Sequence, residues 1–198
     1  VGSEMFTLFG ADFVKRLVAK EFNVFLDLKF HDIPNTVAHA CKAAADLGVW
    51  MMSVHASGGL AMMEAARKAL TSYGTNRPFL IAVTVLTSMS AIDLLLMGVH
   101  EPLEQRVCFL ARLAQEANLD GVVSSALEVP AIKAACGNHF LTVTPGIRLS
   151  SDRQDDQVRI MTPECALKAG SDFLVIGRSI TQANNPALVV HDLLQFMK

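Results

Sequence analysis

Short runs of apolar and β-branched residues alternate along the chain with longer segments in which apolar positions recur every three or four residues. The short runs predict six strands, over residues 24–30, 50–56, 79–86, 121–126, 139–147 and 172–180. Helical spacing is clearest at 5–20, 103–117 and 185–198. This alternation is typical of βα units around a parallel sheet, and it predicts an α/β fold.

The whole chain, residues 1–198, is expected to form a single βα-barrel domain, because no linker and no change of composition divides it. A complete eight-stranded barrel usually takes roughly 250 residues, whereas this chain has 198 residues. The helical pattern at 5–20 also has almost no strand before it. We therefore expect a TIM (β/α)8 barrel that lacks its first strand and most of its second. An open doubly wound sheet is the alternative.

Composition and charge exclude several classes of protein. With 52% hydrophobic and 18% charged residues, the chain is not disordered. Seventeen basic and nineteen acidic residues give a net charge of -2 without a basic cluster, so no nucleic-acid partner is expected. No apolar run approaches the roughly 20 residues of a membrane helix, so no membrane partner is expected. Four scattered cysteines without a CxxC pair predict reduced thiols in a cytoplasmic protein.

The most informative polar positions lie at the end of the first predicted strand. Asp27 and Lys29 point to one face of that strand, about 6.6 Å apart at a rise of ~3.3 Å per residue. A parallel strand covered on both faces should be apolar, and catalytic groups of βα barrels project from the carboxyl ends of strands. Asp32 adds a second carboxylate, and negative charge favours the protonated form of a nearby lysine. Lys29 is therefore a candidate proton donor, although a structural ion pair would show the same pattern.

A second group of candidate residues follows the last two predicted strands. Residues 144–148 (TPGIR) end one strand, residues 176–179 (IGRS) end the next, and Gln157 lies in the polar segment between them. Loops after the last two strands of a βα barrel often bind phosphate, which arginine contacts with two hydrogen bonds. The pattern favours a phosphate site, although a turn with a solvated arginine is the simpler alternative.

Other positions are weaker candidates. His55 either lines a pocket or is a hydrogen-bonded structural histidine. Thr87 either contacts a polar ring or caps a helix. Residues 34–36 are expected to form a rigid turn and a helix cap. The spacing of His, Cys and acidic residues indicates no metal site, so no metal and no cofactor is expected.

Four motifs occur in order along nearly the whole chain: DLKFHDIPNT at 27–36, VTVLTS at 83–88, VTPGIR at 143–148 and VIGRSI at 175–180. Together they resemble the bacterial orotidine 5'-phosphate decarboxylases, and the first motif is highly specific. The resemblance implies a dimeric βα barrel that converts orotidine 5'-monophosphate to uridine 5'-monophosphate and CO2. This reaction is the last step of de novo pyrimidine biosynthesis, and the family carries it out without a metal or an organic cofactor.

The resemblance also implies roles for individual residues. Lys29 would protonate the pyrimidine carbon that loses CO2, and Asp27 would lie beside the substrate carboxylate. Asp32, the third catalytic residue, would reach the neighbouring subunit's site beside Thr36, so that the homodimer is the active unit. The other substrate-binding residues would be Thr87, Arg148, Gln157, Gly177 and Arg178, the last four at the phosphate.

One departure from the family pattern lies at the start of the chain. An aspartate-bearing first strand and a lysine just before Val1 are absent, which reduces the family's array of alternating charges to Asp27, Lys29 and Asp32. Two alternatives stay open. A metal-dependent sugar-phosphate synthase or decarboxylase has a similar Asp-x-Lys-x-x-Asp motif, whose carboxylates can bind Mg2+, although the FHDIPNT continuation favours the nucleotide enzyme. The second alternative is a non-catalytic module that binds a nucleotide phosphate.

Overall fold

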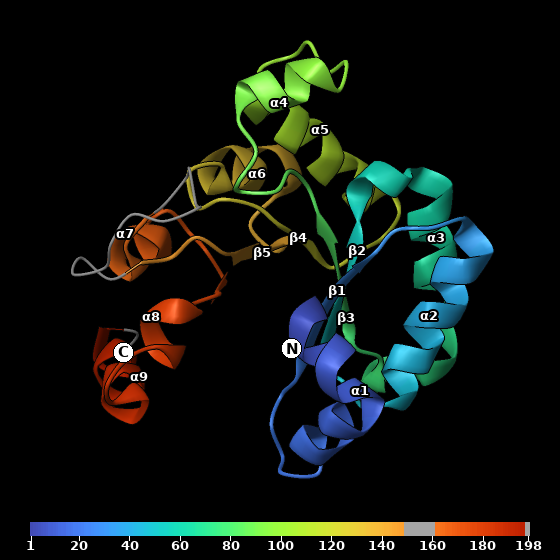
Figure 1. The fold of residues 1–198 in the computed structure, drawn as a ribbon. Helices are drawn as coiled ribbons and strands as arrows, with labels where there is room; N and C mark the ends of the chain where they lie inside the picture. The colour runs from blue at the N-terminus through green and yellow to red at the C-terminus, as the bar shows by residue number, and fades with distance from the viewer. Residues whose placement is uncertain (149–160, 197–198) are drawn as a thin grey trace. The chain divides into compact units, whose positions relative to one another are not determined.

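The computed structural model describes residues 1–148 and 161–196, and its ribbon is drawn in Figure 1. Within these residues, six strands follow one another in chain order in one sheet: β1 Phe25–Phe30, β2 Met51–His55, β3 Phe79–Val83, β4 Gly121–Val123, β5 Leu141–Thr144 and β6 Phe173–Leu174. The pairs β1–β2, β2–β3 and β5–β6 are parallel. The predicted α/β class with a parallel sheet is confirmed.

Helices occupy the segments between the strands. The α-helices are α1 Ser3–Val18, α2 Pro34–Asp46, α3 Leu60–Ala69, α4 Ala91–Leu96, α5 Leu103–Glu116, α6 Val129–Cys136, α7 Pro163–Lys168, α8 Arg178–Thr181 and α9 Pro186–Phe196. Two short 3-10 helices, η1 Ala56–Gly58 and η2 Thr71–Asn76, flank α3. None of the helices in the described ranges has the length and apolar character needed to span a membrane.

Contacts between Cα atoms group the chain into two compact units, Val1–Thr84 with Phe109–Val122 and Val85–Cys108 with Val123–Lys198. In the first unit, β2 and β3 form the centre of the core, and their residues from Met51 to Val54 and from Leu80 to Val83 are buried. Helices α2 and α3 pack against each other beside these strands (Figure 1). Because side chains on both faces of the strands are covered, the strands are apolar runs without alternation.

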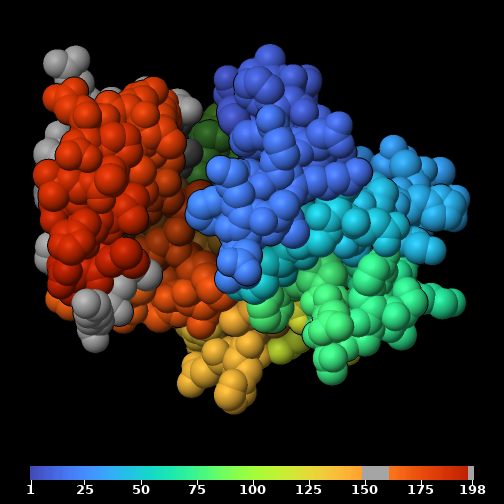
Figure 2. Space-filling model, turned by 90° about the horizontal axis from the view of Figure 1, so that it is seen from below, coloured from blue at the N-terminus to red at the C-terminus, as the bar shows by residue number. Residues whose placement is uncertain are grey.

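The first helix differs from its sequence pattern. Met5, Phe9, Phe13 and Leu17 recur at helical spacing, yet Met5 and Phe9 are 40% and 53% exposed. Gly10 breaks the helical dihedral angles inside α1 with φ of 66° and ψ of -166°, so the first half does not continue the direction of the second. Figure 2 shows α1 at the surface in dark blue.

The last predicted strand, 172–180, is wrong in its second half. Strand β6 ends at Leu174, Gly177 adopts φ of -103° and ψ of -100°, and Arg178 begins the short helix α8. Strand β5 likewise ends at Thr144, because Pro145 cannot donate a ladder hydrogen bond and Gly146 adopts a left-handed φ of 77°.

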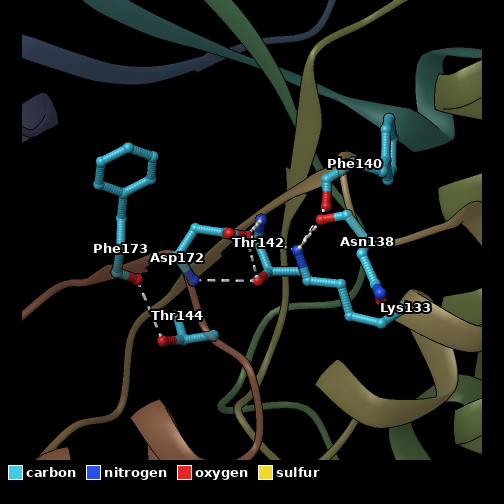
Figure 3. Close-up of polar contacts among 7 residues, drawn as sticks. All are labelled: Lys133, Asn138, Phe140, Thr142, Thr144, Asp172 and Phe173. Carbon is cyan, nitrogen blue, oxygen red and sulfur yellow. Dashed lines mark hydrogen bonds and ion pairs between the residues drawn. The ribbon is translucent and has the colours of Figure 1, made fainter.

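In the second unit, a carboxylate placed just before β6 holds this strand to β5 (Figure 3). Asp172 Oδ2 accepts hydrogen bonds from the backbone N–H of Thr142 at 2.7 Å and from its hydroxyl at 2.9 Å. The Lys133 ammonium donates to the same oxygen at 2.7 Å and to the carbonyls of Asn138 and Phe140. One aspartate thus fixes a helix side chain, a loop and two strands.

The first unit contains the same arrangement before β4. Asp120 accepts two hydrogen bonds from the Arg77 guanidinium, both at 2.6 Å, and a third from the backbone N–H of Leu80 in β3 at 2.8 Å. In both places an aspartate precedes a strand and pairs with a basic side chain and a strand amide. Charge-assisted hydrogen bonds of this kind stabilise strand starts in the fold.

Candidate active site

Asp27 and Lys29 form an ion pair near the end of β1, with Lys29 Nζ 2.6 Å from Asp27 Oδ2. Both side chains are only partly covered, at 28% exposed for Asp27 and 36% for Lys29. At Asp27, β1 has backbone neighbours on both sides, because Gly2 forms a parallel bridge with it and Leu26 pairs with Met52 of β2. The ion pair is therefore held within the sheet while its charged ends remain accessible.

The backbone of β1 is irregular at the same place. The register with β2 shifts between Leu26 and Phe30, and Lys29 adopts a left-handed φ of 53°. Such a conformation is uncommon for a residue with a side chain, and it costs roughly 1 to 3 kcal/mol where the surroundings impose it. Irregular strands of this kind often aim a side chain next to an active site.

Ser53 of β2 supports this irregular segment, although it is not among the candidates predicted from the sequence. Its hydroxyl donates to Asp27 Oδ1 at 2.7 Å and accepts from the backbone N–H of Lys29 at 2.9 Å. Ser53 is fully buried. The available signal was one hydroxyl inside the apolar run 50–56, but its partners depend on the pairing of β1 with β2, which one sequence does not specify.

Asp32 and Thr36 lie beyond the end of β1, and both are exposed. Asp32 Oδ1 accepts a hydrogen bond from the backbone N–H of Ile33, and Asp32 is not an ion-pair partner of Lys29 among the described residues. The expected cap at 34–36 is wrong: Ile33 is the N-cap without a side-chain hydrogen bond, and Pro34 is the first helical residue. Within this chain the two carboxylates therefore have separate partners.

His55 makes the hydrogen bond expected of a structural histidine, which was one of the two alternatives for this position. Its Nδ1 accepts a hydrogen bond from the backbone N–H of Ser57 at 3.3 Å, and its ring stacks on His31 with centroids 5.2 Å apart. Burial lowers the pKa of His55 below its ordinary value of 6.5, and the positive charges of His31 and Lys29 lower it further. The neutral ring is the form that accepts the hydrogen bond from Ser57.

The two predicted phosphate motifs meet at one cavity of the second unit. Arg148 and Gly146 line it from the segment after β5, and Gly177 and Arg178 line it from the segment after β6. The cavity has a volume of about 210 Å³. The Arg148 backbone N–H donates to the Met161 carbonyl at 3.1 Å, which fixes the segment after β5. Two arginines beside glycine backbone can bind an anion through charge and N–H donors.

The remaining candidates are placed as follows. Thr87 is buried in the turn after β3. It does not cap α4, since Ser90 accepts from the backbone N–H of Asp93 in a capping box. Gln157 lies outside the described residues. Within 1–148 and 161–196, no three His, Cys, Asp or Glu residues gather as a possible metal site.

The sequence matches a known family along almost its whole length. The model of the orotidine 5'-phosphate decarboxylase / HUMPS family matches residues 1–193. The chain belongs to this family. The orotidine 5'-phosphate decarboxylase of Legionella pneumophila (strain Corby) is 63% identical over 195 residues, which cover 98% of this chain and 85% of that protein. The protein of the same name from Haemophilus influenzae (strain PittEE) is 58% identical over 193 residues, covering 98% and 84%.

Solved structures also resemble this member of the orotidine 5'-phosphate decarboxylase / HUMPS family. The crystal structure of orotidine 5'-phosphate decarboxylase from Lactobacillus acidophilus is 38% identical, with a TM-score of 0.88 over 100% of this chain and 85% of that chain. The enzyme of the same name from Thermotoga maritima is 24% identical with a TM-score of 0.73, a likeness of fold alone. The family expected from the four motifs is confirmed.

Proposed function

We propose that this chain decarboxylates orotidine 5'-monophosphate to uridine 5'-monophosphate and CO2, the last step of de novo pyrimidine biosynthesis, and is thus a carboxy-lyase. The observation that carries the proposal is the Lys29–Asp27 ion pair of 2.6 Å, which lies in the motif most specific to the family. Relatives named orotidine 5'-phosphate decarboxylase at 58–63% identity support the same substrate.

Lys29 stabilises charge at the ring carbon that loses CO2, and it then protonates that carbon. When the bond between this ring carbon and the carboxylate breaks, the electron pair stays on the ring carbon and CO2 leaves. A fixed ammonium beside that carbon stabilises the developing negative charge, and it then donates its proton to form the new C–H bond. The neutral Lys29 amine regains a proton from water. These steps balance without an oxidant, a metal or an organic cofactor.

Asp27 holds the Lys29 ammonium and lies beside the substrate carboxylate. Its Oδ2 accepts from Lys29 at 2.6 Å and its Oδ1 accepts from Ser53 at 2.7 Å, so the carboxylate has little freedom to rotate. Positioning of this kind contributes to catalysis because the ammonium does not have to be oriented during the reaction.

The phosphate of the substrate is bound by Arg148, Gln157, Gly177 and Arg178, and Thr87 contacts the substrate nearer its ring. Support for the phosphate role comes from the cavity that Arg148, Gly177 and Arg178 line together. A cavity of about 210 Å³ is large enough for a phosphate group. Binding energy from a remote phosphate can be used to order the site around the reacting carbon.

The working enzyme is a homodimer in which Asp32 serves the site of the partner subunit beside Thr36. Exposure of Asp32 and its separation from the Lys29 ion pair support this role. We further propose that the six strands belong to a (β/α)8 barrel and that the enzyme works in the cytoplasm. Parallel pairing in chain order supports the barrel.

An ultraviolet assay tests the proposed function. The chain is incubated with orotidine 5'-monophosphate in the presence of EDTA, and the loss of orotate absorbance is followed. We expect turnover that the chelator does not change. Loss of activity in EDTA would favour the metal-dependent sugar-phosphate enzymes, whereas tight binding of uridine 5'-monophosphate without turnover would favour a binding module.

A further inference from the structure

We propose that Ser53 is a positioning residue for the reaction, because its single hydroxyl holds both the Asp27 carboxylate and the left-handed backbone of Lys29. The hydroxyl donates its proton to Asp27 Oδ1 at 2.7 Å and accepts the Lys29 N–H at 2.9 Å. Among the described residues, no other single atom outside Asp27 and Lys29 forms hydrogen bonds with both of them. This inference rests on the proposed function and deepens it.

The surroundings of Ser53 make these two hydrogen bonds necessary to the local structure. Ser53 is fully buried, and its neighbours along β2, Met52 and Val54, are buried and apolar. A buried hydroxyl without partners costs free energy, so a serine at this position is favourable only while both contacts are made. The Lys29 N–H is likewise satisfied only by Ser53 among the contacts observed for it.

The geometry shows how Ser53 acts on the reaction through other residues. Lys29 adopts φ of 53°, a conformation that a side-chain-bearing residue rarely takes unless its surroundings impose it. The bond from its N–H to Ser53 is one such constraint, and it sets the direction in which the lysine side chain leaves the strand. The second bond occupies Asp27 Oδ1, so that Oδ2 is left facing the Lys29 ammonium.

This arrangement matters most when the negatively charged substrate arrives. The substrate carboxylate repels the Asp27 carboxylate and attracts the Lys29 ammonium, which would rotate Asp27 away and draw Lys29 off the ring carbon. Ser53 opposes the rotation of Asp27, which would break the bond to Oδ1, and it fixes the backbone from which the Lys29 side chain extends. Ser53 should therefore affect the rate of the chemical step more than the binding of the substrate.

The kinetic test compares Ser53→Ala and Ser53→Thr with a matched control, Ser171→Ala. Ser171 is also buried, but its hydroxyl has no hydrogen-bond partner among the described residues, and it precedes β6. In Ser53→Ala we expect kcat to fall about ten- to hundredfold, the loss expected for one hydrogen bond to a charged group, with KM changed less than about threefold. Ser53→Thr keeps the hydroxyl and should recover most of kcat, and Ser171→Ala should keep the wild-type values.

A second measurement reads the same contact without substrate. Hydrogen exchange of the Lys29 amide, followed by NMR, should be faster in Ser53→Ala than in the wild type and slow again in Ser53→Thr. If Ser53→Ala does not fold, Ser53→Cys keeps the side-chain volume with a much weaker hydrogen-bonding group, and it should show the same loss of kcat.

The outcomes separate this inference from the proposed function. Wild-type protein that does not turn over orotidine 5'-monophosphate would overturn the proposed function, and the role of Ser53 in that reaction would fall with it. Turnover by the wild type with unchanged kcat in Ser53→Ala or Ser53→Cys would overturn the role of Ser53 alone. A loss that Ser53→Thr does not recover, or that Ser171→Ala reproduces, would also overturn it.

Discussion

The Nζ of Lys29 lies 2.6 Å from Oδ2 of Asp27, two residues earlier in β1, although the register of that strand shifts between Leu26 and Phe30. In a regular strand the two side chains would stand side by side, about 6.6 Å apart at their Cα atoms. The left-handed φ of Lys29 and the hydrogen bonds of Ser53 to Asp27 and to the Lys29 N–H lie in the same irregular segment.

The Asp27 carboxylate should be required for the reaction because it holds the ammonium of Lys29. Asp27→Asn removes the charge but keeps the shape, and we expect kcat/KM to fall about a hundredfold or more, as for the loss of one group that stabilises a transition state. Asp12→Asn is the matched control, since Asp12 forms an exposed pair with Lys15 at 3.8 Å. Steady-state kinetics should show no change in that control, and equal activity of the two variants would contradict the role of Asp27.

Arg178 should act on the phosphate and not on the reacting carbon. Arg178→Ala should lower kcat/KM about ten- to hundredfold, since a hydrogen bond to a charged group contributes roughly 1.5 to 3 kcal/mol. Arg112→Ala, at an exposed position of α5, should have no effect.

The control for this assignment is a truncated substrate that lacks the phosphate. With it, Arg178→Ala should make little difference, because the group that Arg178 contacts is already absent. An equal loss of kcat/KM with the truncated and the whole substrate would show that Arg178 has a structural role.

Subunit mixing tests whether Asp32 serves the partner's site. Lys29→Ala protein and Asp32→Ala protein should each be inactive, whereas a heterodimer of the two has one site with both residues intact. Part of the activity should return on mixing, and up to about one site in each heterodimer can recover, which we would measure by the ultraviolet assay. No recovery despite demonstrated subunit exchange would place the action of Asp32 within its own chain.

Much of the fold and part of the site follow from sequence pattern. The strand positions could be predicted because β3 is an uninterrupted apolar run and β2 is broken in its interior only by Ser53, and both strands are buried. The arginines at 148 and 178 could be placed together because both follow neighbouring strands, and in the structure they line one cavity.

Other features depend on contacts that local pattern does not contain. The left-handed backbone of Lys29 occurs at a residue type that rarely adopts it, so no composition signal marks it. Ser53 meets Asp27 only through the pairing of β1 and β2, a contact between residues 26 positions apart. The strand predicted up to residue 180 failed because the apolar run continues into α8, whose start depends on the Gly177 backbone.

Asp172 should make the stability of the chain depend on pH. Burial raises the pKa of Asp172, but hydrogen bonds from Lys133 and from Thr142, with the Lys133 charge, outweigh this and lower it below its ordinary value of 3.8. The unfolded chain then binds more protons than the folded chain. The contribution of the Asp172 carboxylate to the free energy of unfolding is therefore full above about pH 3.8, and it is lost as the pH falls through the lowered pKa of the folded state. Asp172→Asn should cost roughly 1 to 3 kcal/mol of unfolding free energy at pH 7.

Urea unfolding from pH 7 to pH 3 measures this contribution. The difference between wild type and Asp172→Asn should shrink toward the acid end of the series, and the exposed Asp192→Asn serves as the control. A difference that stays constant over the whole range would contradict the role assigned to the Asp172 carboxylate.

The most direct test of the account is release of labelled CO2 from carboxyl-labelled orotidine 5'-monophosphate, in EDTA, by the wild type and by Lys29→Ala. Proton donation and charge stabilisation each contribute about a hundredfold or more, so the variant should lose at least about ten-thousandfold in kcat/KM. Lys68→Ala, an exposed lysine of α3, should release CO2 at the wild-type rate. Release by Lys29→Ala at a rate close to that of the wild type would contradict the role of Lys29 as charge stabiliser and proton donor.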